Sequence, residues 1–122
     1  MKDITITNLK ELGKTDSDWG ICATGYSTSH IYKTAKNLVN SLKMLNVEWR
    51  NEPQIHGRKD DDYVAVSIAS DISVLLFVPE SREEMGMEYR WLHWNDEKIL
   101  AEYRKMLNLR KRKSFRNIFN NH

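Results

Sequence analysis

The chain has 122 residues, of which 40% are hydrophobic, 10% aromatic and 30% charged, a composition typical of one folded domain rather than of a disordered segment. The longest uninterrupted apolar run, Val74 to Val78, is far shorter than the roughly 20 residues that a membrane-spanning helix needs, so no membrane partner is expected. Cys22 is the single cysteine, which excludes an intrachain disulfide scaffold and indicates a reducing compartment.

Charge is distributed unevenly along the chain. Seven of the 19 basic residues and none of the 17 acidic ones lie in residues 104–122, so residues 1–103 carry a formal charge of −5 and the rest +7. We expect such a body to repel nucleic acid and such a tail to bind it, although a solvated, frayed terminus is the alternative interpretation. We therefore predict a domain over residues 1–95 and a C-terminal helix with a basic tail over residues 96–122.

The first half of the chain predicts two strands and a long helix. Residues 3–7 alternate polar and apolar side chains and are rich in β-branched residues, which is typical of a strand. Residues 19–24 form a second candidate strand. Ser27 begins a run of hydroxyls suited to a helix N-terminus, and we expect the helix to end near Asn46. One face of this helix collects its apolar residues, Ile31, Ala35, Leu38, Leu42 and Leu45.

The second half predicts three strands and two helices. Residues 72–78 are apolar almost throughout, so we expect this strand at the centre of the sheet, ended by Pro79. Ser81 is expected to cap a short helix through Met87, and Asn95 a second helix. With the further strands at 54–57 and 63–68, this order predicts an α/β fold: a small mixed sheet of about five strands, flanking helices and a C-terminal helical basic extension.

The sequence makes no positive case for an enzyme or a cofactor. Residues 25–27, Gly25-Tyr26-Ser27, stand at a strand-to-helix junction, where free amides could meet a phosphate. Nucleotidyl transfer also needs paired carboxylates for magnesium, and Glu48 is the only acid between residues 31 and 50. The aspartates at 60–62 are expected to form a solvated turn rather than a metal site. Cys22 lies in an apolar strand, so we expect it to be a small buried core residue rather than a nucleophile.

Three blocks of sequence resemble a known family, the ribosomal silencing factors, also called the iojap family. Residues 18–27, DWGICATGYS, are similar to that family's DYFVIATGTS strand and turn. The segments His56-Gly57-Arg58 and Asp62-Tyr63-Val64 resemble its EGR and DWV segments. The strongest block, residues 71–91, follows the family's D-V-V-V-H-x-F-x-P-E-x-R-E-x-x-x-L-E-x-L-W pattern nearly in register. Departures include Trp19 for tyrosine, Tyr63 for tryptophan and Leu75 for histidine.

The resemblance implies a nucleotidyltransferase-like topology without catalytic residues. It also implies a function: such proteins bind ribosomal protein uL-fourteen on the large subunit and block subunit joining, in large-subunit assembly or translational silencing. Mitochondrial members act in a module with a LYR-type protein and an acyl carrier protein. Helices that usually precede the first strand are absent here and a basic tail is added, which favours the mitochondrial matrix. The bacterial cytoplasm is the alternative.

Two sets of candidate binding residues follow. Aromatic residues and arginine are common interface anchors, so the first set, for the ribosomal protein, comprises Asp62, Tyr63, Pro79, Glu80, Arg82, Glu88 and Trp91. For Pro79 and Trp91, closing the end of the sheet is an equal alternative. The second set, for ribosomal RNA, comprises Arg104, Lys105, Arg110, Lys111, Arg112, Lys113 and Arg116. The alternative functions are a nucleotide-binding or nucleotidyltransferase-like enzyme and a free-standing RNA-binding module.

Overall fold

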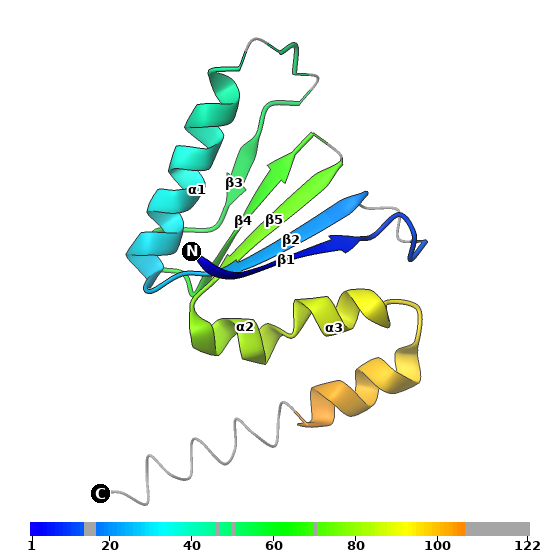
Figure 1. Ribbon diagram of the computed structural model, residues 1–122. Helices are drawn as coiled ribbons and strands as arrows, with labels where there is room; N and C mark the ends of the chain where they lie inside the picture. Colours follow the sequence, from blue (N-terminus) through cyan, green and yellow to red (C-terminus); the bar gives the residue numbers. More distant parts are fainter. Residues whose placement is uncertain (14–16, 46, 50, 70, 107–122) are drawn as a thin grey trace, which may run out of the picture.

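Five strands form one mixed sheet in the computed structural model, which describes residues 1–13, 17–45, 47–49, 51–69 and 71–106 (Figure 1). The spatial order is β1-β2-β5-β4-β3; β2 and β5 run parallel, and the other neighbouring pairs run antiparallel. This confirms the predicted α/β fold and the central position of the apolar strand. The strands are β1 (Lys2–Asn8), β2 (Trp19–Thr24), β3 (Gln54–His56), β4 (Tyr63–Ile68) and β5 (Ile72–Phe77).

Helix α1 (Thr28–Lys43) covers one face of the sheet. The hydroxyl of Ser27 accepts a hydrogen bond from the backbone N–H of His30, which confirms the predicted cap. The buried residues of the helix are Ile31, Ala35 and Val39. The predicted end near Asn46 was too late: the helix ends at Lys43, so Leu45 lies beyond the apolar stripe and is exposed, and Val39 takes part in the core instead.

The opposite face is covered by two short helices, α2 (Pro79–Met85) and α3 (Met87–Leu92). The prediction of one helix capped by Ser81 and running through Met87 was wrong. Pro79 opens α2, where its missing N–H costs no helix hydrogen bond. Gly86 then breaks the run, because its left-handed backbone (φ 50°, ψ 40°) ends α2 before α3 starts.

A further helical stretch covers residues 97–106. The predicted cap Asn95 was wrong by one residue: a carboxylate oxygen of Asp96 accepts from the backbone N–H of Ile99 at 3.2 Å. The stretch packs on the junction of α2 and α3, where the Tyr103 ring stacks on Tyr89 with centroids 4.5 Å apart. This packing crosses the predicted division at residue 95, which itself stays a prediction.

The core has two layers, one on each side of the sheet. The first, between the sheet and α1, gathers Ala23, Ile31, Ala35, Val39, Val64, Val66, Val74, Leu76 and Val78. The second, on the side of α2 and α3, gathers Leu9, Cys22, Leu75, Phe77 and Trp91. No helix in the described part of the chain is long and apolar enough to cross a membrane.

The outer strand β1 is interrupted near its start. Its register with β2 shifts between Lys2 and Thr5, and Asp3 has a positive φ of 52° there. Such a bulge breaks the regular ladder and bends the strand. The Asp3 carbonyl accepts a hydrogen bond from the guanidinium of Arg82 in α2, so the irregular end of β1 is fastened to the helical layer.

Candidate protein-docking surface

The start of β4 and the start of α2 meet at one end of the sheet. The carbonyl of Asp62 accepts hydrogen bonds from the backbone N–H of Val78 at 3.0 Å and from the hydroxyl of Ser81 at 2.7 Å. Tyr63 pairs with Phe77 across the strands, and their rings stack with centroids 5.7 Å apart. These contacts bring the start of β4 next to the start of α2, although the two are distant in sequence.

We call the surface at this junction the acidic docking surface and define it by Asp62, Tyr63, Pro79, Glu80 and Glu84. All five residues are exposed, and the Tyr63 ring remains 39% exposed despite its stack on Phe77. Glu80 and Glu84 are four residues apart in α2, which places them on the same side of the helix. The surface therefore combines an aromatic ring and a proline with three carboxylates.

Arg82 and Glu88 lie behind this surface and form an internal clasp. The Arg82 guanidinium donates from Nε and Nη2 to Oε1 of Glu88 at 3.1 and 2.9 Å, and from Nη1 to Oγ1 of Thr24 at 2.8 Å. Thr5 in turn donates its hydroxyl proton to Oε2 of Glu88 at 2.7 Å. The Arg82 side chain is only 16% exposed. These contacts tie α2 and α3 to β1 and β2, and a docking role for the two residues stays a prediction.

Trp91 is a core residue in this structure. It is 5% exposed and packs in the layer of Leu9, Cys22, Leu75 and Phe77. Its ring lies so close to Gly20 that a Cβ added there would be 2.5 Å from two ring carbons. Closing the sheet is the role that the contacts support, and direct docking by Trp91 stays a prediction.

The alternative phosphate site at Gly25, Tyr26 and Ser27 has its amides largely engaged within the protein. The Gly25 N–H donates to the carbonyl of Phe77 at 2.8 Å, and the Tyr26 N–H donates to Nδ1 of His30 at 3.0 Å. The Ser27 hydroxyl serves as the cap of α1. A phosphate at this turn would have to displace these bonds, so the geometry does not favour nucleotide binding here.

Neither a metal site nor a reactive thiol is found in the described part of the chain. No group of three or more histidine, cysteine, aspartate or glutamate side chains is placed to hold an ion there. Burial raises the pKa of the Cys22 thiol to about 12, an effect that Glu88 strengthens and Arg82 opposes. The thiol is therefore protonated at neutral pH and unsuited to nucleophilic attack, as expected for buried filler.

Most of the predicted RNA-binding residues lie outside the described residues. Arg104 and Lys105 are exposed near the end of the helical stretch 97–106. The other five, Arg110, Lys111, Arg112, Lys113 and Arg116, fall beyond residue 106, so the RNA contact of the tail stays a prediction.

Comparison with known proteins decides the family. The model of the family described as "ribosomal silencing factor during starvation" matches residues 1–119. The chain belongs to the ribosomal silencing factor family. A Chromobacterium violaceum protein of known crystal structure is similar to this silencing factor, with 26% identity and a TM-score of 0.60 over 74% of this chain and 71% of that one. No curated protein matches the sequence significantly.

The sequence prediction missed some residues that the fold places on the candidate binding surfaces. Glu84 joins the acidic docking surface, and its signal was the four-residue spacing from Glu80 within a helix. The lysines of α1 were also missed, because residues 1–103 were expected to repel nucleic acid on the basis of their total charge of −5. That total conceals a helix with Lys33, Lys36 and Lys43 and no acidic residue.

Proposed function

We propose that this silencing factor docks on ribosomal protein uL-fourteen of the large subunit through the acidic docking surface and blocks subunit joining. Family membership supports ribosome association in general. The observation that supports the finer proposal is the pair of hydrogen bonds from Val78 and Ser81 to the Asp62 carbonyl, which join the start of β4 to the start of α2. Tyr63, Asp62 and Glu80 are all exposed on these two elements.

The chemistry of this surface suits a basic protein partner. Interfaces use aromatic residues as buried anchors, with charged groups around them. Tyr63 supplies an exposed ring at the start of β4, and Asp62, Glu80 and Glu84 supply exposed carboxylates on the two elements that meet there. Complementary charge accelerates encounter and fixes orientation, while excluding partners of like charge. A factor bound in this way works by occupying a surface, so it needs no bond-making residues.

The test reverses the charge of this surface. Glu80→Lys with Glu84→Lys is expected to weaken co-sedimentation with isolated large subunits about 10-fold or more, because attraction becomes repulsion. The matched control is Glu97→Lys with Glu102→Lys, which makes the same change of charge at two exposed positions of the stretch 97–106. The control is expected to bind as the parent does.

Subunit joining is then measured by adding small subunits and separating the products on sucrose gradients. The parent and the control are expected to keep the subunits apart, whereas the Glu80/Glu84 variant is not. Equal binding by both variants would overturn the assignment of the surface. Normal joining in the presence of excess parent protein would overturn the proposed function itself.

The enzyme alternative has a separate readout. Calorimetric titration with magnesium and nucleoside triphosphates is expected to give no binding heat, since the Gly25 and Tyr26 amides are already bonded. Binding heat with nucleoside triphosphates, together with no binding to uL-fourteen, would favour the enzyme over the docking factor. The mitochondrial matrix, with a LYR-type protein and an acyl carrier protein as partners, stays a prediction from the resemblance.

A further inference from the structure

Helix α1 has a one-sided charge that the total charge of the body conceals. Its sequence contains Lys33, Lys36 and Lys43 and no aspartate or glutamate. The opposite side of the helix is buried through Ile31, Ala35 and Val39. All three lysines are exposed, so the solvent side of α1 presents only positive and neutral polar groups.

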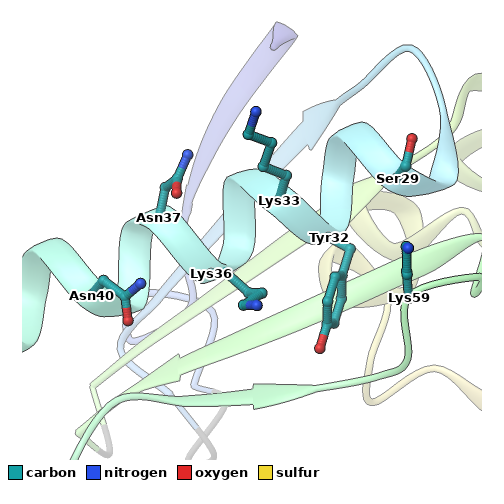
Figure 2. Close-up of a pocket in the computed structure, with 7 residues that line it drawn as sticks. All are labelled: Ser29, Tyr32, Lys33, Lys36, Asn37, Asn40 and Lys59. Carbon is teal, nitrogen blue, oxygen red and sulfur yellow. The ribbon is translucent and has the colours of Figure 1, made fainter.

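A groove of about 500 Å³ runs along this side of α1 (Figure 2). Side chains three and four residues apart on a helix lie about 5–6 Å from each other, which arranges the helical residues in short rows along the groove. Lys59, from the loop between β3 and β4, stands beside Tyr32 and adds a third cation. All lining residues except Tyr32 are exposed: Ser29, Lys33, Lys36, Asn37, Asn40 and Lys59.

The three groove lysines are not neutralised by the part of the chain that the structure describes. None of them has a carboxylate within 4.0 Å there; Lys36 instead lies over the Tyr32 ring, 5.7 Å from its centroid. Lys43, outside the groove, is paired with Glu52 at 3.8 Å. The three acids that follow Lys59 in sequence, Asp60, Asp61 and Asp62, do not line the groove, and Asp61 accepts the Arg58 backbone N–H at 2.7 Å.

We propose that this α1 groove binds the phosphate backbone of RNA. Lysines act as point charges for phosphate, and the asparagine amides and the Ser29 hydroxyl supply further donors. An open groove with several separate cations suits an extended polyanion better than a small ligand, which needs an enclosed pocket. Contacts of this kind position a protein on RNA without reading its sequence.

The helix that carries most of the groove and the helix that carries Glu80 and Glu84 lie on different faces of the sheet. Helix α1 lies on one face of the sheet, and α2, which carries Glu80 and Glu84, lies on the other (Figure 1). The groove therefore extends the proposed docking by a second contact with a different class of molecule. RNA binding by the isolated protein does not require uL-fourteen, so the two proposals fail independently.

The test uses the full chain and a fluorescein-labelled 24-nucleotide RNA hairpin, titrated at several salt concentrations. The triple variant Lys33→Gln, Lys36→Gln, Lys59→Gln is expected to bind about 10- to 100-fold more weakly at 0.1 M salt. Its slope of log K against log salt is expected to be less negative by about 2 to 3, since each lost phosphate contact removes about 0.7 to 0.9. Lys43→Gln, which removes one cation of α1 outside the groove, is the control for a single charge and is expected to lower affinity no more than threefold.

Acetylation with a water-soluble amine reagent locates the contact independently of the tail. The hairpin is expected to slow acetylation of Lys33, Lys36 and Lys59 and to leave Lys98 unaffected, as read by mass spectrometry. An unchanged slope in the triple variant together with unprotected groove lysines would overturn the proposal. So would displacement of the hairpin by equal charge concentrations of poly-glutamate or ATP, since the groove would then take an acidic protein or a small phosphate ester.

Discussion

Gly20 is the position where the structure leaves least room for a side chain on β2. A Cβ at Gly20 would lie 2.5 Å from two carbons of the Trp91 ring. Gly20 is buried in β2, and Trp91 is the buried residue of α3. A methyl group there would push a large, rigid ring out of a dense core, whose neighbours yield little. Glycine is therefore required at position 20 because a side chain has no room there, not because of its backbone conformation.

Gly20→Ala is therefore expected to lower the free energy of unfolding by about 1–3 kcal/mol, the usual cost of overpacking. The measurement is urea denaturation followed by tryptophan fluorescence. Trp91→Leu alone should also destabilise, because it leaves a cavity. The double variant should lose less than the sum of the two single changes, since the smaller side chain makes room for the methyl group. If the two changes in the free energy of unfolding were strictly additive, Gly20 and Trp91 would not interact sterically.

At the residue scale, the sequence predicts which residues are apolar and buried better than it predicts their partners. Ile31 and Ala35 were expected in the core of α1 and are found there. Trp91 was assigned both to docking and to closing the sheet, because a tryptophan suits either role; its burial and its contact with Gly20 support closing the sheet. Arg82 looked like a surface anchor, yet its partners Thr24 and Glu88 come from other elements that the sequence does not show to be adjacent.

At the scale of elements, the clasp between Arg82 and Glu88 fastens the short helices to the sheet. Neither α2 nor α3 is long enough to be stable alone in water, so both depend on tertiary contacts. The clasp supplies charge-assisted hydrogen bonds that reach Thr5 in β1 and Thr24 in β2. Losing it should loosen the helical layer before the sheet itself opens.

Arg82→Met is expected to lower the free energy of unfolding by about 1–3 kcal/mol, because it leaves Oε1 of the partly covered Glu88 carboxylate without its donors, while Oε2 keeps the bond from Thr5. Glu88 is 38% exposed, so water compensates in part and the lower half of that range is expected. Hydrogen exchange should speed up first in α2 and α3. Arg90→Met in α3 is the matched control. Loss of large-subunit binding by a fully folded Arg82→Met variant would instead assign Arg82 to docking.

Element boundaries were predicted well for strands and poorly for the helices after β5. Strand ends coincide with local signals, such as Gly25 after β2 and Pro79 after β5. The break at Gly86 has a local signal, a glycine in the left-handed conformation, but the Tyr103 ring, which would collide with any side chain added there, comes from a distant part of the chain and leaves no local pattern. The end of α1 was misplaced because Leu45 continues the apolar spacing past the last helical turn.

At the scale of the whole molecule, the charge distribution predicts two additive contributions to RNA binding. The tail contributes up to seven cations, and the α1 groove contributes Lys33, Lys36 and Lys59. Each phosphate contact adds about 0.7 to 0.9 to the salt slope. The acidic docking surface opposes nucleic acid on the side of α2, which should orient the protein as well as retain it.

Truncation after Tyr103 is expected to weaken ribosome binding and to flatten its salt dependence by at most about 5 to 6 units of slope. A residual slope should remain, and changing the three groove lysines to glutamine as well should flatten it by a further amount of about 2 to 3. Co-sedimentation at several salt concentrations measures both. Near-ultraviolet circular dichroism checks that Tyr103 still packs on the junction of α2 and α3. An unaltered slope after truncation would mean that the tail is only a solvated terminus.

The irregular start of β1 affects the tendency of two copies of this protein to pair through their edge strands. An edge strand with an unbroken row of free peptide groups invites a second molecule to extend the sheet, which leads to fibrous aggregation. Here the shift between Lys2 and Thr5 interrupts that row, and Arg82 occupies the Asp3 carbonyl. The same guanidinium that anchors the helices thus also helps to limit extension of the sheet by a second molecule at this edge.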